Sequence, residues 1–261
     1  MEKKYKKILL LTVSMVLVAV IIAGIVSAII WGPMLYINPA ETGKVSDVYI
    51  IRNAKNNMFL IKSDDGHIAI DAGHDKDKIQ EELNRFEIDI LEIKYVLITH
   101  SHGDHVAALS LFKNAQIYIN EDELQMMDGS KGNNSLPEGV KLESINWLRN
   151  EELMLGGHKI KCIKTPGHTL GSMIYLVDDK YLFTGDAVEI DKNFLKVHIS
   201  TMDNKKAEES IEIIIKSLIK NCEYVFTSHY RYFKAEDLNL QIPAGLPKFN
   251  HLNFLYQAAN Y

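Results

Sequence analysis

The stretch Leu97-Ile98-Thr99-His100-Ser101-His102-Gly103-Asp104-His105 concentrates more chemistry than any other part of the chain. It begins with the end of a compact apolar run that is typical of a buried strand. The polar cluster therefore follows the carboxyl end of that strand, where α/β folds place their sites. Side chains alternate along an extended segment, so His100 and His102 point the same way and can bind one metal ion. Asp104 and His105 fall at the turn into the next predicted helix and offer ligands for a second metal. Neutral imidazole and carboxylate suit Zn²⁺, and also Fe²⁺ or Mn²⁺.

Three further strand ends carry a potential ligand. His168 follows a strand in the Pro-Gly turn of 164–172, Asp186 ends the run Leu-Phe-Thr-Gly-Asp, and His229 ends the run Phe-Thr-Ser-His. A single histidine at a strand end is more often a structural residue than a ligand, and the cluster at 97–105 by itself would fit a polar surface loop. Four such strand ends in one chain predict a metal centre where the strands meet.

Short strands and helices alternate along the chain from residue 44 onward. Apolar or alternating segments predict strands over 45–51, 58–62 and 67–70, and helical spacing predicts helices over 75–86 and 203–220. Because the two kinds of element are interleaved, we expect one layered α/β domain.

Composition and charge narrow the classes of function. The 261 residues are 47% hydrophobic and 24% charged, with a formal net charge of −5. A chain of this length buries a sizeable core. The mild acidity argues against a nucleic-acid partner, because phosphate binding needs a clustered basic face. The two cysteines, Cys162 and Cys222, are too few for a disulfide framework, and we expect them to pack as small apolar groups.

The N-terminal segment differs from the rest of the chain. Residues 1–7 are rich in lysine, and residues 8–31 contain no charge. As an α-helix, 8–31 would span the ~30 Å bilayer core. We therefore expect a cytoplasmic basic stub over 1–7, a transmembrane anchor over 8–31 and a linker over 32–43, with the remaining chain outside the cytoplasm. The alternatives are a cleaved signal peptide, for which the apolar run is long, and a buried core helix, for which a polar face is missing.

The order of these motifs resembles the metallo-β-lactamase superfamily, and most closely its glyoxalase II and lactonase-like branch. The resemblance covers roughly residues 44–232 and implies a four-layered αβ/βα sandwich. We expect the catalytic domain to span 44–235 and the tail 236–261 to pack on it, either over the cleft as a lid or on a sheet edge. Asp71, in Asp-Ala-Gly after an earlier strand, resembles the family's early aspartate, which orients ligands. Carried over residue by residue, the resemblance implies that His100, His102 and His168 bind a first metal, that Asp104, His105 and His229 bind a second, and that Asp186 bridges the two.

The resemblance also implies a mechanism and a branch. Two zinc ions, or iron or manganese, would share a bridging hydroxide that Asp104 orients, so Asp104 and Asp186 are the expected catalytic residues. True β-lactamases of the superfamily lack an aspartate bridge at the position of Asp186, so antibiotic hydrolysis is not expected. The sequence departs from glyoxalase II after this aspartate, where it reads Ala-Val-Glu-Ile in place of a glycine-rich basic stretch. The expected reaction is hydrolysis of an ester, lactone, thioester or phosphodiester outside the cytoplasm.

Three residues near the ligands in sequence are candidates for binding the substrate: His198, Tyr230 and Tyr232. Their alternative role is surface or core packing. The expected substrate is a small molecule or a cell-envelope component, and the oligomeric state is open. Two other functions remain as alternatives: a persulfide dioxygenase-like enzyme with a single iron, and a catalytically silent binding module at the membrane.

Overall fold

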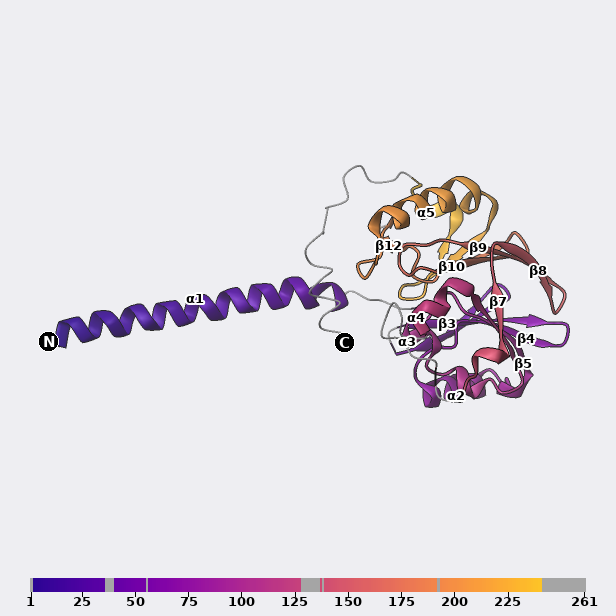
Figure 1. The fold of residues 1–261 in the computed structure, drawn as a ribbon, viewed down its shortest axis with the longest axis horizontal. Coiled ribbons are helices and arrows are strands. Elements are labelled where there is room, and N and C mark those ends of the chain that lie inside the picture. The colour runs from indigo at the N-terminus through magenta and orange to yellow at the C-terminus, as the bar shows by residue number, and fades with distance from the viewer. Residues whose placement is uncertain are drawn as a thin grey trace.

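The computed structural model describes residues 2–35, 40–54, 56–127, 137, 139–191 and 193–240. The predicted N-terminal helix is present as α1 (Glu2–Leu35), which extends away from the rest of the molecule in Figure 1. Among the residues that the structure describes, however, no helix combines the length and the apolar character needed to cross a membrane. The transmembrane anchor predicted over 8–31 is therefore not supported.

The first sheet is mixed and has seven strands. Neighbours in the sheet follow the order of the chain: β1 (Gly43–Val45), β2 (Val48–Asn53), β3 (Asn56–Ser63), β4 (Gly66–Ile70), β5 (Ile93–Leu97), β6 (Gln116–Asn120) and β7 (Ile145–Leu148). Strands β1 to β4 pair antiparallel, and β4 to β7 pair parallel. Parallel neighbours need crossover connections. These carry α2 (Lys76–Arg85), α3 (Gly103–Val106) and α4 (Leu124–Met127), together with short 3-10 turns.

The second sheet has six strands in the order β15-β14-β11-β10-β9-β8. Their bounds are β8 (Glu151–Leu155), β9 (His158–Lys164), β10 (Met173–Val177), β11 (Tyr181–Phe183), β14 (Tyr224–Phe226) and β15 (Phe233–Lys234). Only the β11–β14 pair is parallel. Its crossover contains α5 (Asn204–Ser217) and the separate hairpin of β12 (Glu189–Asp191) and β13 (Phe194–Lys196).

Side-chain alternation produces the layers. On β3, Phe59 joins the cluster between the two sheets, whereas the next residue, Leu60, joins a cluster on the outer face of the first sheet, under α2. On β10, Tyr175 faces the central cluster and Leu176 faces α5. Figure 1 shows α2 and α5 on opposite outer sides of the paired sheets. The α/β sandwich with four layers is confirmed.

One detail differs from the sequence prediction. The segment 45–51 was expected to be one strand, but β1 and β2 form a hairpin in which Val45 pairs with Val48, and Ser46 at the turn has a φ of 53°. Of the predicted tail 236–261, only 236–240 is described, and there Leu238 packs against the outer cluster of the second sheet. Residues 241–261 lie outside the described residues.

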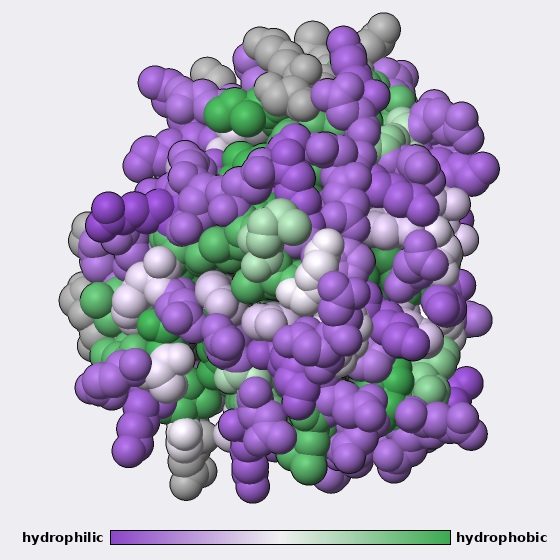
Figure 2. All heavy atoms as spheres, turned by 90° about the vertical axis from the view of Figure 1, so that its right-hand side faces the viewer, coloured by the Kyte–Doolittle hydropathy of each residue, from purple (hydrophilic) through white to green (hydrophobic). Residues whose placement is uncertain are grey.

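The turn between β3 and β4 contacts the turn between β8 and β9, and this contact joins the two sheets. It lies at the end of the molecule where Figure 1 places the labels β4 and β8. The backbone N–H of Asp64 donates to the carbonyl of Gly156 (2.9 Å). Gly157 has a φ of +87°, a left-handed backbone conformation that favours glycine. Figure 2 shows this end covered mainly by hydrophilic side chains, with hydrophobic patches between them, as is usual for a protein surface.

Candidate metal centre

The predicted ligands come together because five strands end at the same edge of the sandwich. The first sheet supplies four of the ligands, from the loop and helix after β5, and also Asp71, which follows β4. The second sheet supplies the other three ligands, one each after β9, β11 and β14. The structure brings all seven positions into one cluster: His100, His102, Asp104, His105, His168, Asp186 and His229.

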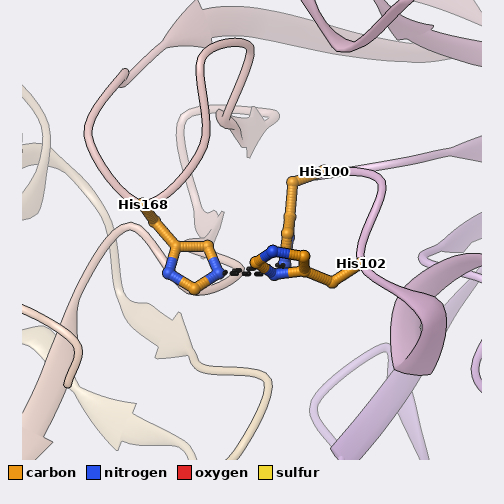
Figure 3. A group of neighbouring side chains, drawn as sticks. All are labelled: His100, His102 and His168. Atoms are coloured by element: carbon orange, nitrogen blue, oxygen red, sulfur yellow. Dashed lines mark hydrogen bonds between the residues drawn. The ribbon is translucent and has the colours of Figure 1, made fainter. Parts of the chain in front are cut away.

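The first group consists of three histidines, drawn in Figure 3. Nε2 of His100 lies 3.0 Å from Nδ1 of His102, and Nε2 of His168 lies 3.1 Å and 2.9 Å from these two atoms. In a tetrahedral zinc site with Zn–N distances of about 2.0–2.1 Å, neighbouring nitrogens lie about 3.3 Å apart. The three ring nitrogens therefore form a triangle close to one face of such a site.

The second group consists of Asp104, His105 and His229. Oδ2 of Asp104 lies 3.5 Å from Nε2 of His105 and 3.4 Å from Nε2 of His229. Oδ2 of Asp186 lies between the two groups. It is 3.1 Å from Nε2 of His229 and 3.7 Å from Nε2 of His105, and it is also 3.4 Å from Nε2 of His168 in the first group. A single carboxylate oxygen is thus placed to contact a cation in either group.

One buried atom shows that a metal fits this arrangement. Nδ1 of His105 donates to Oδ2 of Asp71 (2.8 Å), so that in the neutral ring the lone pair is on Nε2. This Nε2 is buried and, among the described residues, has no hydrogen-bond partner. A buried polar atom without a partner is costly, and a cation held with Asp104 and His229 would satisfy it.

The pKa values of the histidines differ between the two groups. Burial, together with the neighbouring histidines, holds the pKa of His100 well below its usual range, and burial does the same for His168, so both rings are neutral and have a lone pair to offer. Burial also acts to lower the pKa of His105 and His229, but carboxylates outweigh it. Asp104, Asp71 and Asp186 raise the pKa of His105 well above its usual value, and chiefly Asp186 raises that of His229 to about 9. Metal binding in the second group therefore displaces protons.

Asp71 connects the ligands of both groups. Besides His105, its carboxylate accepts the backbone N–H of Thr99 (2.8 Å) and the Thr99 hydroxyl (3.0 Å). Because this hydroxyl donates to Asp71, it accepts from Nδ1 of His100 (3.1 Å), which leaves the lone pair of His100 on Nε2. Asp71 is fully buried and has a φ of 60°. Its predicted role, orienting ligands without binding metal, agrees with this position.

Sequence reasoning missed a second buried carboxylate, Glu123. Its Oε2 accepts the backbone N–H (2.8 Å) and the hydroxyl (2.5 Å) of Ser101, which lies between two ligand histidines. Its Oε1 accepts the hydroxyl of Thr169 (2.5 Å) and the N–H of Gly171 (2.8 Å), in the loop of His168. Glu123 thus ties together two loops that come from different sheets. No sequence signal distinguishes it from the partly exposed acids beside it.

The three predicted substrate residues lie in different surroundings. Nε2 of His198 is 3.9 Å from Oδ2 of Asp186, so His198 borders the metal centre. The Tyr230 hydroxyl donates to Oε1 of Glu189 (2.7 Å). Tyr232 packs near the rings of two aromatic residues of β14, Tyr224 and Phe226. His198 therefore lies beside the candidate ligand Asp186, whereas the Tyr230 hydroxyl is bound to Glu189.

Comparison with known proteins supports this fold and the stretch of chain that carries the candidate site. The family model of the metallo-beta-lactamase superfamily matches residues 52–229, which include every predicted ligand. The chain belongs to the metallo-β-lactamase superfamily.

Members of the superfamily that resemble the chain are known by sequence and by structure. A probable polyketide biosynthesis zinc-dependent hydrolase, BaeB of Bacillus velezensis, is 35% identical over 51% of this chain and 55% of its own length. Hydroxyacylglutathione hydrolase of Dictyostelium discoideum is 30% identical over 54% of this chain and 51% of its own. The chain thus spans about half the length of these relatives. A β-lactamase from Chitinophaga pinensis shares the fold, with a TM-score of 0.55 and 24% identity over 70% of this chain and 75% of that chain.

Proposed function

We propose that this member of the metallo-β-lactamase superfamily is a hydrolase that uses two zinc ions to cleave an ester, lactone, thioester or phosphodiester. The observation that carries the proposal is the position of Asp186. Its Oδ2 lies 3.4 Å from a nitrogen of the first histidine group and 3.1 Å from a nitrogen of the second. A carboxylate oxygen in this position can be shared by two metals in adjacent sites.

Each residue has a defined task in this proposal. His100, His102 and His168 would hold the first zinc, and Asp104, His105 and His229 the second. Bound zinc would supply Lewis acidity, lowering the pKa of water and polarising the substrate oxygen. The side chain of Asp104 is 41% exposed, in contrast to the buried Asp186. Asp104 therefore reaches the open side of the centre, where its carboxylate can accept a proton from an attacking water.

The names of the relatives support zinc and hydrolysis. One is a probable zinc-dependent hydrolase, and another hydrolyses hydroxyacylglutathione, which favours an acyl substrate. The glyoxalase II and lactonase-like branch is proposed on this support and on the bridging position of Asp186. The location outside the cytoplasm and the cell-envelope substrate remain predictions from the sequence.

The test is a substrate panel with the full-length chain loaded with zinc. The panel contains a thioester, a lactone, a bis-aryl phosphodiester and a β-lactam, and metal content is measured for every sample. Asp186→Asn is the test variant, and Asp77→Asn, an exposed aspartate in the first turn of α2, is the matched control. We expect turnover of one substrate class by the wild type and the control, and loss of about 100-fold or more in the test variant.

Other outcomes would overturn the proposal. One iron per chain with consumption of oxygen would assign the chain to the dioxygenase class. Two bound zinc ions with no turnover of any substrate in the panel would favour the catalytically silent binding module.

A further inference from the structure

His198 lies beside the metal centre but differs from the ligand histidines. It follows β13 in a loop that is fixed on the loop of His168. The N–H of Met202 donates to the carbonyl of His168 (3.3 Å), and that of Asp203 donates to the carbonyl of Gly167 (2.9 Å). The ring centroid of His198 is 4.9 Å from that of His168. The loop contacts hold this ring against the centre.

The hydrogen bonding of His198 determines which nitrogen carries its proton. The backbone N–H of Ser200 donates to Nδ1 of His198 (3.2 Å), so Nδ1 supplies the lone pair. In the neutral ring the hydrogen is then on Nε2. His100 and His105 have the opposite arrangement, since Nδ1 of each is the donor and Nε2 carries the lone pair. His198 therefore presents an N–H to the centre.

The direction of this N–H matters because of what lies in front of it. Nε2 of His198 is 3.9 Å from Oδ2 of Asp186, which is beyond hydrogen-bond distance. The side chain keeps 13% of its surface exposed, and within the described part of the chain Nε2 has no hydrogen-bond partner. A donor that is held beside a bridging carboxylate and left open has the properties of a group that binds an oxygen of the substrate.

We propose that His198 is the hydrogen-bond donor of this centre, and that its Nε2–H binds a negatively charged or polarised oxygen of the substrate's acyl or phosphoryl group. His198 is then a substrate-binding residue and not an eighth ligand, although it lies within reach of a metal held by His168 and Asp186. For the identity of the substrate the proposal rests on the proposed function. The tautomer of His198, and its role as a hydrogen-bond donor that does not bind metal, can both be tested without measuring turnover.

The first experiment measures the tautomer in the wild-type chain. Two-bond ¹H–¹⁵N correlations of zinc-loaded, full-length protein distinguish a histidine protonated at Nε2 from one protonated at Nδ1. His198→Gln identifies the signal by removing it. We expect His198 to be protonated at Nε2. A His198 signal with the proton on Nδ1, or with Nε2 bound to zinc, would overturn the proposal.

The second experiment measures binding of an oxyanion probe, inorganic phosphate, by titration calorimetry. His198→Leu removes the donor, and His198→Gln replaces it with an amide N–H. Both variants should keep the zinc content of the wild type. His198→Leu should weaken phosphate binding about tenfold or more, and His198→Gln should stay within about threefold of the wild type.

The outcomes separate this inference from the proposed function. Loss of zinc in both variants would make His198 a ligand, and equal phosphate affinity in all three proteins would remove its role as a donor. If the wild type turns over no substrate of the panel, the proposed hydrolase fails. The tautomer and the phosphate affinities would still decide the role of His198.

Discussion

Replacing the buried carboxylate of Glu123 should weaken both the fold and the first metal group. Glu123 accepts four hydrogen bonds, two from Ser101 at 2.8 and 2.5 Å, one from Thr169 at 2.5 Å and one from Gly171 at 2.8 Å. In Glu123→Gln, one oxygen becomes an NH₂ that cannot accept. In either orientation of the amide, its NH₂ group faces one hydroxyl and one backbone N–H. The hydroxyl can rotate and accept a hydrogen bond from the NH₂ group, but the backbone N–H cannot accept one.

The magnitude follows from that count. One buried N–H without an acceptor costs about 1–3 kcal/mol, and the loss of a charge-assisted acceptor adds to it. We expect Glu123→Gln to lower the free energy of unfolding by about 2–4 kcal/mol. Because the two tethered loops carry His100, His102 and His168, zinc affinity should fall about 10–100-fold, as for other groups that orient ligands.

The assay combines urea unfolding of the zinc-free chain with zinc competition against a chromophoric chelator. Glu121→Gln is the matched control, because Glu121 is 42% exposed and pairs with the exposed Arg149. Such a surface pair contributes at most about 1 kcal/mol. If Glu123→Gln behaved like this control in both measurements, the role of Glu123 as a tether would be refuted.

Three further predictions concern other parts of the molecule. Asp71→Asn removes the carboxylate that two ligands depend on, so zinc affinity measured by chelator competition should fall about 10–100-fold. Burial opposes protonation of His158, but the Asp178 carboxylate, 2.6 Å away, raises its pKa above the usual value. The stabilisation is therefore fully present below the unfolded pKa near 6.5 and is lost as pH rises through the folded pKa. Urea unfolding should show His158→Gln less stable by about 1 kcal/mol at pH 5.5 and by less at pH 9. Gly185→Ala would place a Cβ 2.6 Å from a neighbouring side chain at a φ of +51°, and should lower the melting temperature and the zinc content. Gly103→Ala, with nothing within 4 Å, should leave both unchanged.

The metal centre was more predictable than the elements around it. Because polar residues at the ends of neighbouring strands meet at one edge of a sheet, the positions of the seven candidate ligands could be predicted from the motifs at 97–105, His168, Asp186 and His229. The structure brings these residues together as expected. Asp71 was singled out only because its Asp-Ala-Gly motif resembles the early aspartate of the superfamily.

The rest of the site could not be read from the sequence, because it depends on tertiary contacts. Glu123 is buried, whereas Glu121 two residues before it is partly exposed, and both lie in the same short acidic run after a strand. The hairpin of β1 and β2 was missed because residues 45–51 read as one continuous strand pattern across Ser46. The proton on Nε2 of His198 depends on a backbone N–H two residues further along the chain, which no residue pattern encodes.

The centre exists only when the two sheets pack against each other, since each metal group takes ligands from both. The apolar contribution to this packing is large. The ring centroid of Phe59 in the first sheet lies 5.3 Å from that of Phe183 and 5.4 Å from that of Phe226 in the second sheet. Apolar contact is not directional, however, and would tolerate small shifts between the sheets. The position of one sheet relative to the other is fixed by hydrogen bonds that cross the interface beside the candidate ligands. Asn57 donates from its backbone to the carbonyl of Ser228 (2.7 Å), next to His229, and Glu123 joins the loops of the first group. The hydrophobic core therefore brings the sheets together, and buried polar contacts set the distances between the ligands.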